Sequence, residues 1–299
     1  MKKRIQRCQL ARGQWLDLPG ALLSETGFIR LREPPEADVS ALLDLLREGQ
    51  YGKPFVVDDG RTLRLHFSLD YVQSEMSAQD PDALQFEYVQ QMTAFLLFVP
   101  RPRHISIVGL GGGSLTKFCY RQLPQTQVTT IEIDEDVIAF SELFGVPQDD
   151  ARLQLVHADA VDYFDRPDAF GGPDRTDVVL IDGCDRNGIA PSLRNEQFYR
   201  NVHDRLQRNG MMVMNLVGKS DSIHEHLHLI ASVFGGRQIV RRVRSSGNRI
   251  VFALKNPMYF PDWKAIQRLA RKLQEEHGLD YPDLARKLRR APQFQSYTG

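Results

Sequence analysis

Residues 104–134 constrain the fold of this chain more than any other stretch, because they read as strand, glycine-rich loop, helix and strand. The first apolar run is His104–Val108, the loop is Gly109–Gly113, and a helix-compatible segment continues to Gln122. A second apolar run carries Glu132 near its end, and this carboxylate can accept hydrogen bonds from two ribose hydroxyls. Glycine suits the loop because the turn uses backbone angles that a side chain disfavours, and because the main chain has to approach a ligand closely. The stretch therefore predicts the nucleotide-binding edge of a doubly wound α/β sheet.

The spacing of the glycines separates two classes of cofactor. Gly109, Gly111 and Gly113 satisfy GxGxG, the pattern usual in folds that bind S-adenosylmethionine. A dinucleotide fingerprint, GxGxxG or GxGxxA, would need glycine or alanine at position 114, where this chain has Ser114. We therefore expect an adenosyl-sulfonium ligand rather than NAD, with these three glycines and Glu132 as binding residues. A tight structural turn without a ligand is the alternative.

Composition limits the remaining classes of function. The chain has 299 residues, a formal net charge of zero and 25% charged residues, which give no overall attraction to nucleic acid or to an anionic membrane. No apolar run has the length of a transmembrane helix or of a signal-peptide core. The three cysteines, Cys8, Cys119 and Cys184, show no paired spacing, so we expect a reduced, cytoplasmic setting.

Apolar runs and helical periodicities alternate along the rest of the chain. Predicted strands cover 127–133, 153–159, 176–181 and 210–217, and predicted helices cover 135–144, 195–207 and 221–234. A hairpin of 54–57 with 62–67 and a helix over 81–99 come earlier, and two adjacent strands, 238–243 and 249–254, close the series. This order predicts an α/β fold of the class I S-adenosylmethionine-dependent transferase type, with a Rossmann-like sheet. The expected organisation is a β-rich N-terminal subdomain over 1–80, the Rossmann-like domain over 81–256 and a basic helical extension over 257–299.

Acidic residues lie at the ends of two predicted strands, on the sheet edge where ligands bind. Asp159 ends the third strand, and with Ala160 it is the natural place for an adenine contact; a helix N-cap is the alternative for the same carboxylate. Asp182 and Asp185 follow the fourth strand. Two carboxylates at this edge favour a cationic substrate, and capping of the turn after the strand is the structural alternative.

Together these motifs carry a family resemblance. Gly109–Ile138, Asp159 and the Asp182-x-x-Asp185 pair resemble the polyamine aminopropyltransferase (spermidine synthase) family over residues 50 to 255, most closely its divergent spermidine synthase-like branch. The resemblance implies transfer of an aminopropyl group from decarboxylated S-adenosylmethionine to an amine acceptor, with release of methylthioadenosine and without a metal. It implies Asp182 as base or amine-orienting carboxylate, Asp185 as amine contact, Glu132 on the ribose, Asp159 on the adenine, Gln73 near the nucleoside and Asp134 as a further cofactor residue. Family members commonly form dimers or tetramers, so a homodimer is a hypothesis.

The chain also departs from that family's motifs. The acid of the family's GGGDGG loop, which holds the aminopropyl nitrogen, corresponds to Gly112, and the Tyr-His-Glu type segment corresponds only loosely to Tyr88–Gln90. One alternative is a methyltransferase that uses intact S-adenosylmethionine, whose methionyl carboxylate would find room at Gly112. Another is a catalytically silent nucleoside-binding homologue. The basic run Arg237–Arg244 suggests a nucleic-acid-binding protein, against which the zero net charge argues.

A further motif, His224–His228, formally matches the HExxH pattern of zinc proteases. Ile223, Leu227 and Ile230 already form an apolar stripe in this segment, which fits the helix expected after the fifth strand. We therefore expect no metal site here.

Overall fold

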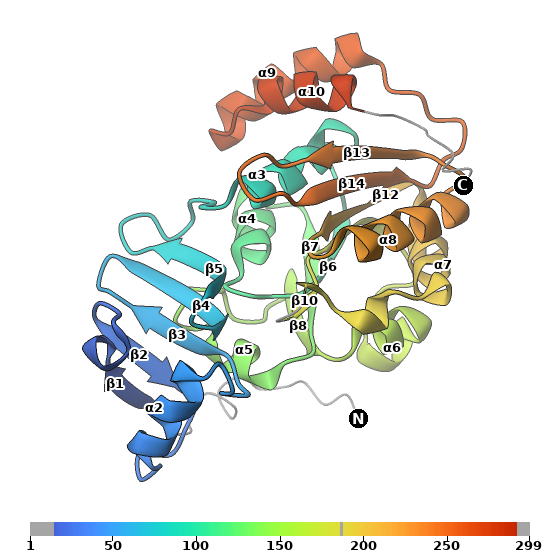
Figure 1. Ribbon diagram of the computed structural model, residues 1–299. Helices are drawn as coiled ribbons and strands as arrows, with labels where there is room; N and C mark the ends of the chain where they lie inside the picture. Colours follow the sequence, from blue (N-terminus) through green and yellow to red (C-terminus); the bar gives the residue numbers. More distant parts are fainter. Residues whose placement is uncertain (1–14, 186–187, 292–299) are drawn as a thin grey trace.

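The computed structural model describes residues 15–185 and 188–291, and its ribbon has a small N-terminal sheet beside a larger sheet flanked by helices (Figure 1). The strands are β1 (Leu16–Pro19), β2 (Phe28–Leu31), β3 (Phe55–Asp58), β4 (Thr62–Ser68), β5 (Tyr71–Ser77), β6 (His104–Val108), β7 (Gln127–Glu132), β8 (Leu153–His157), β9 (Thr176–Ile181), β10 (Cys184–Asp185), β11 (Gly188–Ile189), β12 (Leu206–Leu216), β13 (Gln238–Arg242) and β14 (Arg249–Leu254). The α-helices are α2 (Val39–Arg47), α3 (Glu87–Met92), α4 (Ser114–Gln122), α5 (Glu135–Phe140), α6 (Ala160–Asp165), α7 (Glu196–Arg205), α8 (Ser220–Val233), α9 (Trp263–His277) and α10 (Tyr281–Arg290). The 3₁₀ helices are η1 (Gly20–Leu23), η2 (Thr93–Leu97), η3 (Pro167–Phe170) and η4 (Pro191–Leu193).

The larger sheet has the strand order β13-β14-β12-β9-β6-β7-β8. Strands β8, β7, β6, β9 and β12 run parallel, whereas β14 is antiparallel to β12 and β13 is antiparallel to β14. Parallel neighbours need a crossover connection, which is why helices alternate with these strands along the chain. The order confirms the predicted class I α/β fold, including the antiparallel pair that closes the series.

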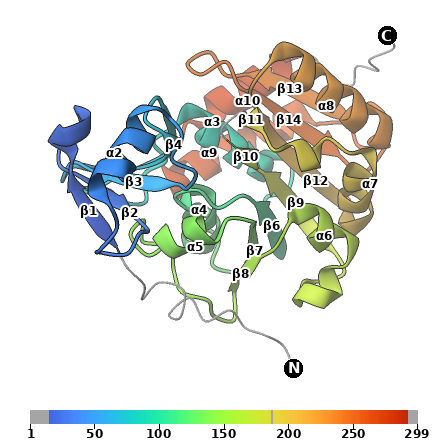
Figure 2. The same ribbon diagram turned by 60° about the horizontal axis from the view of Figure 1, so that its bottom comes forward.

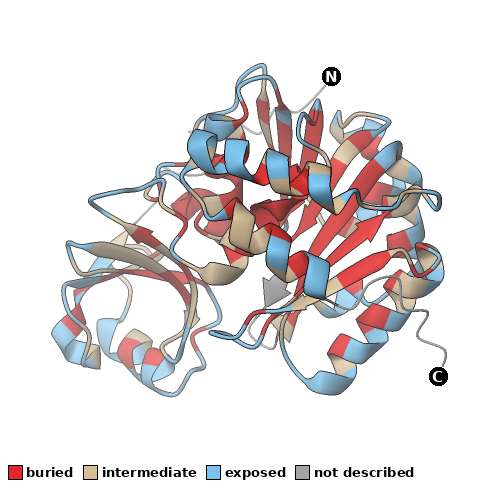
Figure 3. Ribbon diagram, turned by 90° about the horizontal axis from the view of Figure 1, so that it is seen from above, coloured by how far each residue is buried: buried red, intermediate tan, exposed pale blue. Residues whose placement is uncertain are grey.

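Helices bury both faces of the larger sheet (Figures 2 and 3). In β9, Val178 and Leu180 pack with α3, α4, α9 and α10, whereas Val179 and Ile181 pack with α6, α7 and α8. Successive side chains of a strand point to opposite faces, so a continuous apolar strand contributes to both cores. The strand interiors are thus used for packing, which leaves the carboxyl ends of the strands and their loops for ligand binding.

The N-terminal sheet is antiparallel throughout, in the order β1-β2-β3-β4-β5. Its β3–β4 pair confirms the predicted hairpin, and the Asp59 carboxylate closes the turn by accepting hydrogen bonds from the backbone N–H groups of Arg61 (2.9 Å) and Thr62 (2.7 Å). Strand β5 was not predicted, because the polar Gln73 and Ser74 interrupt the apolar alternation that marks a strand.

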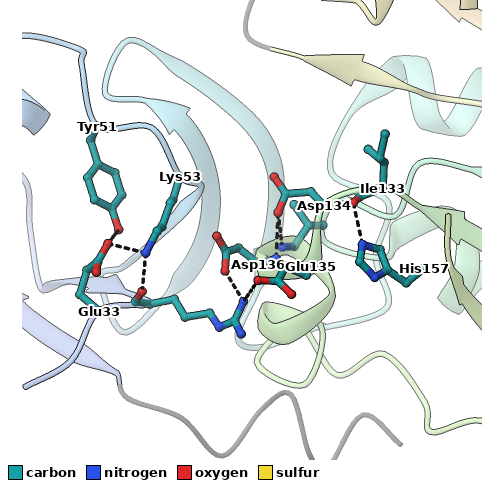
Figure 4. Close-up of polar contacts among 10 residues, drawn as sticks. Glu33, Tyr51, Lys53, Ile133, Asp134, Glu135, Asp136 and His157 are labelled. Atoms are coloured by element: carbon teal, nitrogen blue, oxygen red, sulfur yellow. Dashed lines mark hydrogen bonds and ion pairs between the residues drawn. The ribbon is translucent and has the colours of Figure 1, made fainter. Parts of the chain in front are cut away.

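Ion pairs fix this sheet against the larger one (Figure 4). Arg32, which follows β2, pairs with Asp136 and also lies 3.4 Å from Glu135 Oε1, both on α5. At the same corner, Lys53 Nζ pairs with Glu33 Oε1 at 2.8 Å. The Arg32 contacts join the N-terminal sheet to α5, the helix that follows β7 on the ligand-binding edge.

The predicted helix over 81–99 is wrong in its first part, because the chain is irregular before α3 and continues after it as η2. Tertiary contacts explain the difference. The Lys117 ammonium donates to the Pro81 carbonyl, and the Gln90 side chain donates to the Leu84 carbonyl at 2.7 Å. Carbonyls that accept hydrogen bonds from side chains in this way do not need the N–H partner that a helix would supply.

Other boundaries also differ from the prediction. The helix expected over 135–144 is the shorter α5, because the chain turns back after it and the N–H of Val146 donates to the carbonyl of Ser141. The C-terminal residues form the helix pair α9 and α10, packed near η2 and β13. Within 15–185 and 188–291, no helix has the length and apolarity needed to cross a membrane. The domain division at residues 80 and 256 stays a prediction.

Candidate functional site

A cavity of about 870 Å³ lies at the carboxyl edge of the larger sheet. Its walls come from β4 and β5, the segment leading into α3, the glycine loop after β6, the ends of β7, β9 and β12, and the β13–β14 loop. Ligands of open α/β sheets bind at this edge. The N-terminal sheet therefore closes one side of the site predicted from the glycine loop.

The glycine loop divides into ligand-facing and supporting positions. Gly109 and Gly111 line the cavity. Gly109 has φ +89°, and a Cβ there would lie 2.3 Å from the carbonyl oxygen of Asp182, so the loop and the end of β9 touch through backbone. Gly113 is not among the described lining residues; it caps α4 with φ +73°, and a Cβ there would lie 2.2 Å from Val146. Close packing against Val146 therefore explains why position 113 is a glycine.

Glu132 lines the cavity at the end of β7 and organises the loop around it. Its two carboxylate oxygens accept hydrogen bonds from the backbone N–H groups of Leu110 (2.7 Å) and Asp134 (2.9 Å). Burial raises the pKa of the Glu132 carboxyl, and the two N–H donors oppose that rise. A carboxylate has lone pairs beyond two bonds, so contact with a ribose stays compatible with this role.

Two further acids of the sequence prediction are helix caps. The Asp134 carboxylate accepts from the N–H groups at the start of α5, and this residue is not among the described cavity-lining residues. Asp159 caps α6 by accepting from the N–H of Val161 at 2.8 Å, and it also lines the cavity, as does Ala160. One carboxylate thus caps a helix and faces the site, and the adenine contact stays a prediction.

Asp182 lies at the end of β9, in the cavity wall, and is held by two donors. The Tyr88 hydroxyl donates to its Oδ2 at 3.2 Å, and the Asn215 side-chain amide donates to its Oδ1 at 2.8 Å. Asn248, on the β13–β14 connection, donates in turn to Asn215 Oδ1 at 2.8 Å. Burial raises the pKa of the Asp182 carboxyl, and the bonds from Asn215 and Tyr88 partly oppose this. Asp185 lies in β10, and its side chain is outside the described part of the structure.

The orienting network around Asp182 was not predicted from the sequence. Asn215 is the last residue but one of β12 and Asn248 sits in a turn-like segment, so each has an ordinary local explanation. An asparagine buried at the carboxyl end of a parallel strand was the available signal.

Gln73, on β5, brings an unused donor to the cavity. Its Nε2 is buried and finds no hydrogen-bond acceptor among the described residues. Buried polar groups are nearly always paired, so this donor is available to an acceptor group in the cavity.

The structure corrects the expectation of open room at Gly112. A Cβ on this residue would lie 2.6 Å from Ser74 Oγ and 2.9 Å from Phe144 Cδ1. Lys117 fixes this packing because its buried ammonium donates to the Phe144 carbonyl at 2.9 Å, and burial lowers the pKa of Lys117 to about 8. A side chain therefore cannot enter at position 112 without displacing its neighbours.

The HExxH segment is an ordinary part of α8. His224 and His228 are exposed, whereas His226 is buried and lies 2.6 Å from the Tyr199 hydroxyl. Over residues 15–185 and 188–291, no group of three or more His, Cys, Asp or Glu residues could hold a metal ion.

The strand order, the glycine loop and the acids at the carboxyl edge define a class I, S-adenosylmethionine-dependent type of transferase fold with a cavity at that edge. The sequence model described as "Spermine/spermidine synthase domain" matches residues 85–248, and this chain belongs to that family. A polyamine aminopropyltransferase from Neisseria meningitidis serogroup A is 32% identical over 240 residues, which are 79% of this chain and 89% of that protein.

Solved structures agree on the fold. A probable spermidine synthase from Corynebacterium glutamicum has a TM-score of 0.59 at 17% identity, covering 74% of this chain and 84% of that one. Human Methyltransferase-like protein 13, in complex with SAH, has a TM-score of 0.56 at 22% identity, covering 71% of this chain and 97% of that one. At these identities the likeness shows the fold alone.

Proposed function

We propose that the protein transfers an aminopropyl group from decarboxylated S-adenosylmethionine to an amine acceptor and releases methylthioadenosine. The observation that carries this proposal is the position of Asp182. It lines the same cavity as Gly109, Gly111 and Glu132, and it is oriented by Tyr88 and Asn215. A nucleoside at the glycine loop would therefore share the cavity with a carboxylate suited to an amine.

The chemistry needs few protein groups. The lone pair of the acceptor nitrogen attacks the aminopropyl carbon next to sulfur; the C–N bond forms, the C–S bond breaks, and its electron pair returns to sulfur. The leaving thioether is neutral, so it needs no acid. The attacking amine has to lose a proton, and Asp182 is the proposed acceptor of that proton, with Asp185 as a further proposed amine contact. The raised pKa of Asp182 makes its carboxylate a stronger base than an exposed aspartate.

Other residues at the carboxyl edge of the larger sheet are proposed contacts for the nucleoside half of the donor. Glu132 would accept the ribose hydroxyls, Asp159 and Ala160 would face the adenine, and the unpaired Gln73 Nε2 would donate to the nucleoside. Gly109 and Gly111 would let the ligand approach the backbone.

A transfer assay tests the proposal. The protein is incubated with decarboxylated S-adenosylmethionine and 1,4-diaminobutane, and methylthioadenosine and the extended amine are measured by mass spectrometry. Asp182→Asn should lower kcat by about 100-fold or more, the contribution of a positioned general base, and leave methylthioadenosine binding unchanged. Asp165→Asn, at an exposed carboxylate on α6, is the matched control and should keep full activity. Absence of methylthioadenosine with every amine tried would contradict the proposal, and S-adenosylhomocysteine formed from intact S-adenosylmethionine would replace it with methyl transfer.

Two further proposals concern setting and assembly. The proposal of a cytoplasmic location rests on the cysteines, whose spacing shows no paired motif. The proposal of a homodimer rests on the family resemblance. Light scattering tests the second, and a monomeric mass would contradict it.

A further inference from the structure

The formal net charge of zero conceals a separation of charge along the chain. Residues 226–299 contain 14 Lys or Arg and 5 Asp or Glu, a net charge of +9, so the preceding residues carry −9. No acidic residue occurs between Glu225 and Asp262. Charge asymmetry of this degree is typical of chains that bind a polyanion. A zero net charge therefore does not exclude a nucleic-acid-binding surface confined to the C-terminal part of the fold.

The fold gathers many of these cations on the helix pair α9 and α10, which lies beside β13 (Figures 1 and 3). The inner sides of the two helices carry buried apolar residues, among them Ile266, Leu273 and Leu288, which pack into the core of the larger sheet. The outer sides carry exposed cations: Lys264, Arg268, Arg271 and Lys272 on α9, and Arg286, Arg289 and Arg290 on α10. The acids of this segment lie at the helix ends: Asp262, Glu275, Glu276, Asp280 and Asp283.

A row of like charges runs along the outer side of α9. Lys264, Arg268 and Lys272 follow one another at intervals of four residues, with a rise of about 6 Å per interval. Like charges at this spacing destabilise a helix. Asp262 acts on the first two charges, but its carboxylate accepts the N–H groups of Lys264 and Ala265 as the cap of α9. No ion pair of the described residues includes any of the three cations, so the row costs helix stability without a paired carboxylate in return.

An exposed aromatic ring lies at the amino end of the same helix. Phe260, two residues before the Asp262 cap, keeps 64% of its surface exposed. The Arg237 guanidinium lies over its ring, 4.7 Å from the ring centroid. Arg237 immediately precedes β13 and begins the basic run Arg237–Arg244. Aromatic rings and guanidinium planes are the surfaces on which the bases of single-stranded nucleic acids stack, beside cations that follow the phosphates.

We propose that the outer side of α9, together with Phe260 and Arg237, binds the phosphodiester backbone and an unstacked base of a single-stranded nucleic acid. The row of cations suits a linear polyanion, because its successive charges lie along one line. The apolar sides of α9 and α10 are buried in the core, so neither helix has an apolar face to insert into a lipid surface. The inference concerns binding and is independent of the proposed transfer reaction.

Fluorescence anisotropy with labelled single-stranded RNA and DNA of about 20 nucleotides measures this binding without turnover. For the wild-type protein, log K should fall linearly with the logarithm of the salt concentration between about 50 and 200 mM. Combined Lys264→Gln, Arg268→Gln and Lys272→Gln removes three phosphate contacts, so the slope should become smaller by about 2 and binding at the lowest salt concentration should weaken about tenfold or more. Phe260→Ala should weaken binding about fivefold or more and leave the slope unchanged, because stacking releases no counterions.

The matched control combines Arg47→Gln, Arg166→Gln and Arg200→Gln, at exposed arginines outside the helix pair. It removes the same number of charges and should leave the affinity within about twofold. The triple variant of α9 should unfold at the same urea concentration as wild type or a higher one, because like-charge neighbours are removed and glutamine is a good helix former.

Three results would overturn the inference. They are no binding of either oligonucleotide by the wild-type protein at the lowest salt concentration, equal weakening by the α9 variant and by its control, and tighter binding of phosphatidylserine vesicles than of the oligonucleotides. Equal binding of RNA and DNA would support contacts with phosphates and bases alone, and a preference for RNA would add the ribose hydroxyls to the supported contacts.

Discussion

Replacement of Asn215 by leucine should move the pKa of Asp182 upward. The Asn215 amide is buried, donates to Asp182 Oδ1 at 2.8 Å, and is itself held by Asn248. A donor of this kind favours the ionised carboxylate. Its loss therefore adds to the rise in pKa that burial already causes.

The magnitude follows from the hydrogen bond that is removed. A hydrogen bond to a charged group contributes about 1.5–3 kcal/mol, and about 1.36 kcal/mol corresponds to one pKa unit. Asn215→Leu should thus disfavour the ionised Asp182 carboxylate by about 1.5–3 kcal/mol and raise its pKa. Tyr88→Phe removes the longer bond, 3.2 Å to Oδ2, and should give a smaller rise.

The assay is the pH dependence of kcat/KM for the amine, together with carbon NMR of the aspartate carboxyls as a readout that needs no turnover. The acidic limb should move to higher pH, because a more alkaline solution is then needed to ionise Asp182. The matched control is Asn209→Leu, at an exposed asparagine that also accepts from a neighbouring asparagine amide, that of Asn256. An unmoved Asp182 titration in Asn215→Leu would refute the orienting role of this network.

Two other perturbations test the loop and the core. Gly109→Ala should lower the free energy of unfolding by at least about 2 kcal/mol, because φ is +89° and the new Cβ would lie 2.3 Å from the Asp182 carbonyl. Gly60→Ala, at φ +80° in open space, should cost about 1 kcal/mol in the same urea titration, and equal losses would contradict the close approach. Burial lowers the pKa of His104 to about 4, whereas the same side chain in the unfolded chain titrates near pH 6.5. As the pH falls, the unfolded chain therefore binds a proton at His104 before the folded chain does. The stabilisation that is present above about pH 6.5 is lost as the pH falls toward 4. Between pH 7.5 and 5 this loss should be about 2 kcal/mol; His104→Gln should lose less than wild type over that range, and identical pH profiles would contradict the assignment.

Local patterns in the sequence were sufficient to predict the class of the fold. The run His104–Val108 followed by GxGxG, and the apolar strand Thr176–Ile181 buried on both faces, predicted a parallel sheet, because each pattern depends on neighbours in the chain. The segment before α3 was mispredicted for the opposite reason. The Pro81 carbonyl accepts from the Lys117 ammonium, and a contact with a residue so far along the chain leaves no periodic trace in the segment itself.

The candidate site was predictable to the extent that its residues end strands. Glu132, Asp159 and Asp182 line one cavity, as strand ends at one sheet edge should. Asp134 and Gly113 belong to the same motifs, yet one caps α5 and the other packs against Val146. Sequence spacing gives the position of such residues along the chain and leaves open whether a carboxylate faces a ligand or its own helix. Contacts such as Ser245 with Glu87 join distant segments and need the folded arrangement.

The central claim is that this cavity holds an adenosyl-sulfonium donor whose cationic tail points toward Asp182. Calorimetric binding of decarboxylated S-adenosylmethionine, intact S-adenosylmethionine and methylthioadenosine, side by side, tests it most directly. We expect methylthioadenosine and the decarboxylated donor to bind, the latter about tenfold or more tighter than the intact compound, whose carboxylate would meet Asp182 and Glu87 as like charges. Tighter binding of intact S-adenosylmethionine, or binding of none of the three, would contradict the claim.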